Sequence, residues 1–194
     1  MTRSARALFA ALLTANVWGT VMAADDVRVD ARLKDRNTRL EVAWSVHNPG
    51  DRPWLALVRP LRHDLQPARH GLYVLAGDDG VVEFALRAFA APPGGGSAAL
   101  ERIAAVALAP GASLEGVVSL ELPLALRSPY RDNRPLPAGV THARVCIGLL
   151  DPVAEPAAAP GSRLPDGALA LYHEAAVAAR QRVVCSAPQA LAGR

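Results

Sequence analysis

Cysteine, methionine, lysine and aromatic residues are all scarce in this chain of 194 residues. Both methionines, Met1 and Met22, lie close to the N-terminus, and the only two cysteines lie in the C-terminal quarter. Cu(I) prefers the soft sulfur ligands of methionine and cysteine, so a copper site would depend on histidines such as His63 and His70. Platforms that stack sugars or single-stranded nucleic acid need exposed aromatic rings, and very few are available here.

The few aromatic residues follow the apolar faces of the sequence pattern. Trp44, Tyr73 and Phe84 lie in predicted strands, at positions expected on their apolar faces. Large rings at such positions are expected to pack in a core. We therefore predict that these three residues are structural and that few rings are left to contact a ligand.

The motifs of common catalytic classes are absent as well. The chain has no G-x-S-x-G elbow, no H-E-x-x-H motif, no phosphate-binding loop and no dinucleotide fingerprint. The stretch GGGS lacks the strand-then-helix context of a nucleotide-binding loop, which indicates a polar linker. We predict no cofactor, no metal site and no enzymatic activity, and a hydrolase assembled from distant Ser, His and acidic residues is the alternative.

The first 23 residues have the pattern of a secretory signal. MTRSAR carries two arginines and no acid, ALFAALL is a short apolar run, and VMA precedes ADD. This order predicts export and cleavage after Ala23, leaving residues 24–194 as one domain in the periplasm or secreted. The apolar run is shorter than the roughly 20 residues that span a bilayer, so no membrane span is expected in the mature chain.

The charge balance argues against nucleic-acid binding. The chain has 21 basic and 18 acidic residues, and cleavage removes Arg3 and Arg6. The mature chain then carries 19 basic residues against 18 acidic ones. Nucleic-acid binding requires a concentrated basic face, which this balance does not provide.

Cys146 and Cys185 are predicted to form a structural disulfide. In an oxidising compartment two cysteines usually pair, and closing this loop stabilises the fold by roughly 4 kcal/mol in the chain-entropy model. A zinc site needs three or four ligands, and only His142 stands near Cys146. A reactive thiol would need a positioned base, and it remains the second possibility.

Alternation of apolar and polar residues predicts an all-β fold. The segments VRVDARL and RLEVAWSVH place every second side chain on an apolar face, as half-buried antiparallel strands do. GLYVLA and VVEFALRAF, joined by GDDG, predict a hairpin, and RIAAVAL with SLEGVVSLEL, joined by APG, predicts another. We expect a single antiparallel β-sandwich of about 8–9 strands.

Three long connections and one ambiguous segment complete the pattern. The connections cover residues 59–70, 90–101 and 150–167, and the last two are rich in Pro, Gly and Ala. Residues 174–180, EAAVAAR, contain good helix formers. We favour a strand there because Cys185 must approach Cys146 across neighbouring backbone.

Two turn-containing stretches resemble a known superfamily. WSVHNPGDRPW and LAPGASLEGVVSLELP are similar to the turns of bacterial immunoglobulin-like or fibronectin-like sandwich modules. The resemblance covers roughly half of the mature chain, and it implies roles in adhesion, assembly, ligand binding or inhibition. The order Cys, Trp, Cys of antibody domains is absent, because Trp44 precedes both cysteines.

Basic side chains are concentrated in the stretch RPLRHDLQPARH. The stretch contains one acidic residue, Asp64, and five basic ones, namely Arg59, Arg62, His63, Arg69 and His70. Arginine binds carboxylate or phosphate with paired hydrogen bonds, and histidines could add pH dependence near pH 6–7. We predict a stiff, exposed loop that binds an anionic group, with Arg131 and Arg134 in a second basic loop; a merely solvated loop is the alternative.

These observations favour an exported, non-enzymatic β-sandwich protein that binds a protein partner with an acidic surface or assists assembly. A periplasmic hydrolase and an inhibitor or immunity-type protein are the alternatives.

Overall fold

The computed structural model describes residues 26–78, 80–91, 101–152 and 163–191. The predicted signal peptide over residues 1–23 lies outside these ranges, as do most of residues 90–101 and 150–167. The described part of the chain is all-β, with one short helix, α1 (Ala175–Arg180). The strands are β1 (Arg28–Asp35), β2 (Arg39–His47), β3 (Trp54–Leu61), β4 (Tyr73–Ala76), β5 (Val81–Leu86), β6 (Arg102–Leu108), β7 (Ser113–Glu121), β8 (Ala125–Ser128), β9 (Arg131–Pro135), β10 (His142–Leu150), β11 (Leu169–Tyr172), β12 (Arg182–Cys185) and β13 (Gln189–Ala190).

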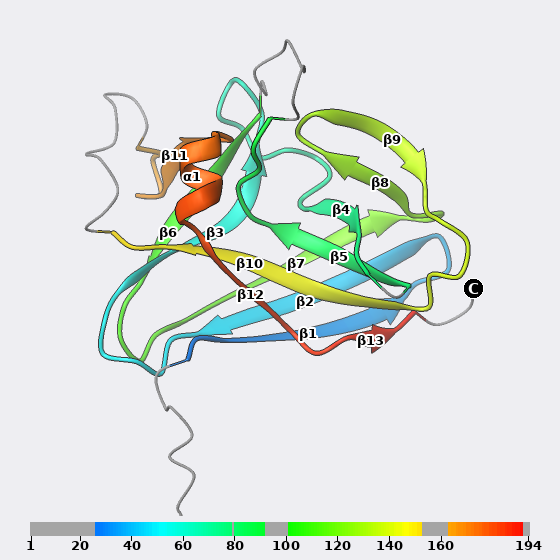
Figure 1. Ribbon diagram of the computed structural model, residues 1–194, viewed down its shortest axis with the longest axis horizontal. Helices are drawn as coiled ribbons and strands as arrows, with labels where there is room; N and C mark the ends of the chain where they lie inside the picture. The colour runs from blue at the N-terminus through cyan, green and yellow to red at the C-terminus, as the bar shows by residue number, and fades with distance from the viewer. Residues whose placement is uncertain (1–25, 79, 92–100, 153–162, 192–194) are drawn as a thin grey trace, which may run out of the picture.

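The smaller of two sheets contains β1, β2 and β7 in that order (Figure 1). Both pairs of neighbouring strands in this sheet are antiparallel, and β2 pairs with β7 over the full length of both strands. The alternation seen in the sequence sets its faces, since Val42 and Val46 are fully buried while their neighbours are partly exposed. One face of the sheet therefore contacts the core and the other faces solvent.

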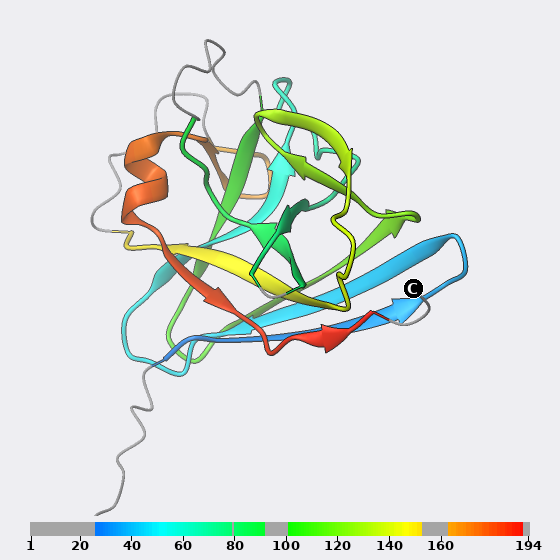
Figure 2. The same ribbon diagram turned by 45° about the vertical axis from the view of Figure 1, so that its right-hand side comes forward.

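The larger sheet is organised around β10. Its strands run in the order β11, β6, β3, β10, β5, β4, β8 and β9, and β12 and β13 also pair with β10. The sheets pack face to face, so the expected β-sandwich is confirmed (Figure 2). One pair, β5 with β10, is parallel, which the prediction of an antiparallel sandwich did not include. The described chain also has more strands than the 8–9 expected, because several are short.

One of the two predicted hairpins is confirmed and the other is wrong. β4 and β5 pair as expected, whereas β6 joins the larger sheet and β7 the smaller one. The connection between them therefore crosses from one sheet to the other. The burial patterns differ accordingly, because β6 has buried residues on both faces and β7 alternates.

Asn48 fixes this crossing between the sheets. Its side chain is fully buried, and its Nδ2 donates to the carbonyl oxygens of Arg52 at 2.8 Å, Leu108 at 3.2 Å and Ala109 at 3.2 Å. The carbonyl of Asn48 accepts a hydrogen bond from Gly111 at 2.8 Å. One amide thus holds together the connections that follow β2 and β6.

The larger sheet is covered on both faces. Its inner face packs on the smaller sheet, and the buried residues there include Trp44 and Phe84. Its outer face carries a second core that includes Tyr73 and Val177 of α1. The three aromatic residues expected in the core are buried as predicted.

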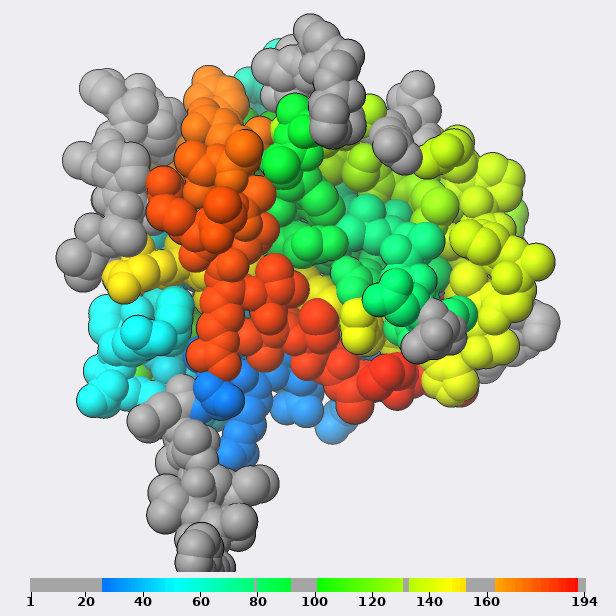
Figure 3. Space-filling model, viewed as in Figure 1, coloured from blue at the N-terminus to red at the C-terminus, as the bar shows by residue number. Residues whose placement is uncertain are grey.

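The strand expected at residues 174–180 is wrong, because Ala175–Arg180 form the helix α1. β12 begins only at Arg182 and still brings Cys185 opposite Cys146 on β10. The disulfide therefore needs no strand before residue 182, and alanine-rich residues are free to adopt the helix that they intrinsically favour. In Figure 3 the segment containing α1 and β12, coloured orange to red, runs across the face in view.

Cys146 and Cys185 form a disulfide, as the sequence predicts. Cys146 is fully buried on β10, and the antiparallel pairing with β12 brings the two Cα atoms to 4.0 Å. The bond ties β12 to β10, the strand around which the larger sheet is organised.

Candidate functional site

The five residues of the predicted basic loop lie in different local environments. Arg59 lies within β3, contrary to the expectation of a loop from residue 59, and it forms an ion pair with Asp166. Arg62 forms an ion pair with Asp64 at 3.0 Å. His63 is exposed. The remaining two residues, Arg69 and His70, line a cavity between the sheets.

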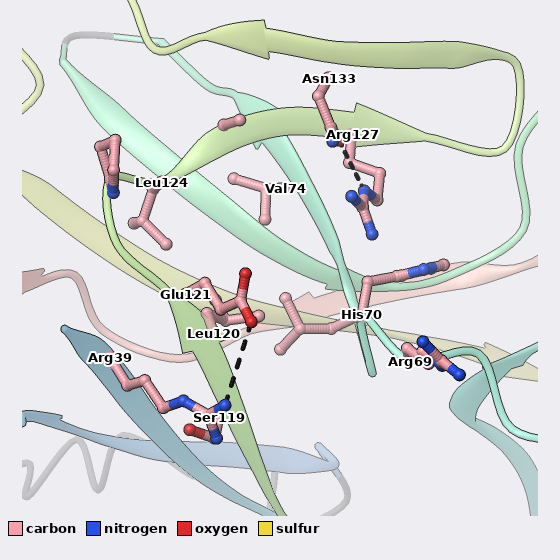
Figure 4. A pocket seen from close by; sticks show the side chains of 13 residues that line it. Arg39, Arg69, His70, Val74, Ser119, Leu120, Glu121, Leu124, Arg127 and Asn133 are labelled. Atoms are coloured by element: carbon pink, nitrogen blue, oxygen red, sulfur yellow. Dashed lines mark hydrogen bonds and ion pairs between the residues drawn. The ribbon is translucent and has the colours of Figure 1, made fainter.

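This cavity, which we call the arginine cavity, has a volume of about 630 Å³. It opens where the end of β7 in the smaller sheet faces β4 and β8 of the larger sheet (Figure 4). Its floor consists of four buried apolar side chains that belong to the core between the sheets, namely Leu72, Val74, Leu120 and Leu124. A ligand in this cavity would therefore contact the hydrophobic core directly.

Three arginines from different parts of the chain surround the floor. Arg39 comes from β2, Arg127 from β8 and Arg69 from the connection before β4. Arg39 and Glu121 lie on one side of the hollow, and Arg69 and Arg127 lie on the other (Figure 4). The lining thus combines three guanidinium groups with one carboxylate.

The local partners leave much of this positive charge available. Glu121 approaches Arg39 only to 3.9 Å, and both side chains are exposed. Arg127 donates from Nε to Asn133 Oδ1 at 2.8 Å, which orients the guanidinium without neutralising it. Arg39 and Arg127 were not predicted, because Arg39 lies far from both basic stretches in the sequence and Arg127 lies just before the second one.

A buried polar cluster lies behind the cavity, on the other face of β4. We call it the Tyr73 cluster, and it comprises Tyr73, His70, Glu101 and His173. The Tyr73 hydroxyl donates to Glu101 Oε2 at 3.0 Å and contacts His173 Nε2 at 2.9 Å. Because Tyr73 has a single hydroxyl proton and gives it to Glu101, His173 Nε2 donates to the Tyr73 oxygen.

His70 connects the cluster with the arginine cavity. Its Nε2 lies 3.8 Å from Glu101 Oε2, and the ring packs 5.3 Å from the ring of Tyr73. At the His173 end of the cluster, the Tyr130 hydroxyl donates a hydrogen bond to the backbone carbonyl of His173 at 2.7 Å. The cluster is therefore held by groups from widely separated parts of the chain.

Burial controls the ionisation of the cluster. It lowers the pKa of His173 to about 4, and burial followed by the charge of Arg127 lowers the pKa of His70 to about 4. Burial raises the pKa of Tyr73 and of Glu101, although the Tyr73 hydrogen bond and Arg127 act in the opposite direction on Glu101. Both histidines are consequently neutral at pH 7, so His70 does not supply the pH dependence near pH 6–7 expected for it.

The described residues do not assemble a serine hydrolase triad. Their one serine–histidine hydrogen bond joins His47 Nδ1 and Ser113 Oγ at 3.0 Å, on the exposed ends of β2 and β7. No carboxylate among the described residues is recorded on the other ring nitrogen of His47. The arrangement thus lacks the third group that orients a catalytic histidine.

One group of potential metal ligands occurs within the described ranges. It consists of Glu83, Cys146 and Cys185. Both sulfur atoms belong to the disulfide, and a disulfide offers no thiolate for zinc. His63 and His70, which the sequence suggested for a histidine-only site, are not part of such a group.

No protein-family model, curated protein or solved structure matches this chain. The resemblance to immunoglobulin-like modules therefore stays a prediction, and the two-sheet architecture rests on the structure itself. Within the described residues, no helix is long and apolar enough to cross a membrane.

Proposed function

We propose that this protein is a non-enzymatic binding module that captures an acidic segment of a partner protein in the arginine cavity. A carboxylate of the segment binds between Arg39, Arg69 and Arg127, and an adjacent apolar side chain packs on the floor. The observation that carries the proposal is the placement of three guanidinium groups above four buried apolar side chains. Arginine is suited to such sites because its planar group binds a carboxylate with two hydrogen bonds.

The shape and polarity of the site favour a peptide segment over a polyanion. A volume of about 630 Å³ is within the usual range of roughly 300–1,000 Å³ for ligand pockets. Nucleic acid would need a broad basic surface and would place polar phosphates against the apolar floor. A single acidic residue beside an apolar one satisfies both halves of the cavity.

We further propose that the protein acts outside the cytoplasm, in the periplasm or secreted. The disulfide between Cys146 and Cys185 supports this, because such bonds persist in oxidising compartments. The signal-like pattern of residues 1–23 supports it independently. An inhibitor or immunity-type protein would use the same cavity and differ only in its partner.

Peptide libraries test the proposal. One library carries a single aspartate or glutamate flanked by apolar residues, and its twin carries asparagine or glutamine at the same position. Binding is measured by fluorescence anisotropy at low and high salt. We expect saturable binding of acidic members only, weakened by salt because the charges are partly exposed.

Matched arginine variants locate the binding. Arg69→Gln/Arg127→Gln should reduce affinity by about tenfold or more, since it removes two groups that contact the carboxylate. Arg59→Gln/Arg62→Gln removes the same charge outside the cavity and should change affinity by less than about twofold. Equal affinity for both libraries, or equal losses in both variants, would contradict the proposal.

A further inference from the structure

β7 forms an open edge of the smaller sheet. It pairs with β2 on one side, and among the described residues no strand pairs with its other side. Asn48 donates to Ala112 at 3.0 Å and Leu122 donates to Thr38 at 2.9 Å, at the two ends of the pairing. Antiparallel pairs alternate, so the odd-numbered residues from 113 to 121 direct their N–H and C=O groups towards the open edge.

The opposite edge of the same sheet is protected. Exposed charged side chains alternate along β1, and charges discourage edge-to-edge pairing. The side chain of Gln189 also hydrogen-bonds to the backbone of β1, accepting from Leu33 N at 3.3 Å and donating to the carbonyl of Ala31. β7 carries fewer charges, Glu115 and Glu121, and no lysine or proline, and among the described residues no comparable side chain is hydrogen-bonded to its outward-facing backbone.

An exposed valine and a groove accompany the open edge. Val117, in the middle of β7, is 68% exposed. On the inner side a groove of about 390 Å³ is lined by Leu114, Gly116 and Val118 of β7 and by Trp44 beside them. A nine-residue edge strand with free backbone groups, a central apolar residue and an unfilled groove is a template for another strand.

We propose that two copies of this protein form a dimer through antiparallel pairing of their β7 strands. The two smaller sheets then become one continuous sheet, with the two-fold axis passing between the two Val117 residues. The unpaired N–H and C=O groups of each β7 bond to the other copy. This proposal is independent of the ligand of the arginine cavity.

The sequence of β7 is complementary to itself in this register. With Val117 opposite Val117, Glu115 faces Ser119 and Ser113 faces Glu121, so no two carboxylates are opposed. On the inner face Leu114 lies opposite Leu120, which places apolar side chains beside the groove. Moving the axis to residue 118 would set Glu115 against Glu121, and moving it to residue 116 would set Val117 against Glu115. Like charges directly opposite destabilise a sheet, which disfavours the axis at residue 118. The axis at residue 116 loses the apolar contact between the two Val117 side chains, so the register centred on Val117 is favoured.

Sedimentation of the disulfide-intact protein at several concentrations tests the proposal. We expect a concentration-dependent dimer for the wild type. Val117→Lys should weaken it by about tenfold or more, because two ammonium groups would be opposed at the axis. Val183→Lys is the matched control, since Val183 is also exposed, at 39%, but lies on β12, and it should leave the dimer unchanged.

Cysteine cross-linking provides a second readout if Val117→Lys disturbs folding. Val117→Cys should give a covalent dimer under mild oxidation, and Val183→Cys should not. A wild-type protein that stays monomeric up to about 1 mM would overturn the proposal. Equal cross-linking of the two cysteine variants would overturn it as well.

Discussion

Three consecutive residues separate two environments in this protein. Leu72 and Val74 contribute to the floor of the arginine cavity, and Tyr73 between them points into the Tyr73 cluster. The alternation of a strand produces this division. The sequence therefore indicates that Tyr73 is buried, but it does not identify Glu101 and His173, which lie 28 and 100 residues away.

The Tyr73 cluster makes stability depend on pH. Burial lowers the pKa of His173 from 6.5 to about 4. Between pH 6.5 and pH 4, His173 is therefore protonated in the unfolded chain and neutral in the folded protein. Stability is thus present above pH 6.5 and declines as the pH falls towards 4, by up to about 3 kcal/mol for this residue. Glu101, whose pKa is raised, opposes the trend because its folded state takes up a proton first.

His173→Gln tests this dependence. Glutamine can donate to Tyr73 without titrating, so chemical denaturation between pH 7 and pH 4 should show a flatter loss of stability than the wild type. His63→Gln is the control, because His63 is exposed and its replacement should leave the wild-type profile intact. Parallel profiles for wild type and His173→Gln would show that His173 is not the responsible group.

At the level of elements, burial pattern is more informative than turn chemistry. The turn APG after β6 is typical of a hairpin, yet it connects two sheets. RIAAVAL is apolar after Arg102, as expected of a strand buried on both faces, whereas SLEGVVSLE alternates. This contrast indicates that β6 is buried on both faces and that β7 has one face in solvent.

The helix α1 gives a second example. The disulfide was a sound constraint, but it fixes only Cys185 and its immediate neighbours on β12. The residues before β12 need only cover the outer face of the larger sheet, and Val177 does so. Local helix propensity therefore decided the structure of residues 175–180.

Removing the disulfide should lower stability without altering the arginine cavity. Cys146→Ala/Cys185→Ala removes the covalent link between these positions and so gives the unfolded chain more conformational freedom. The free energy of unfolding should therefore fall by about 2–5 kcal/mol. Alanine suits the buried site of Cys146 because it adds no polar group. Urea denaturation measures the loss, and reduction of the wild type should reproduce it; an unchanged midpoint would show that the bond does not stabilise the fold.

At the level of the whole molecule, the sandwich class follows from sequence but the cavity does not. Alternation predicts a sandwich of two sheets, and the structure contains one, although the larger sheet is buried on both faces. The arginine cavity depends on strand order, which brings Arg39, Arg69 and Arg127 together across more than 80 residues of sequence. Clustering of basic residues along the chain pointed instead to Arg59 and Arg62, whose charges are neutralised by Asp166 and Asp64.

The central claim is that a carboxylate binds at the arginine cavity. The most direct test is NMR chemical-shift mapping of isotope-labelled protein titrated with an acidic peptide from the library and with its asparagine or glutamine twin. We predict saturable shifts concentrated in residues 69–74 and 119–127, absent with the twin and lost in Arg69→Gln/Arg127→Gln. Shifts concentrated around Arg59 and Arg62, or equal shifts with both peptides, would contradict the account.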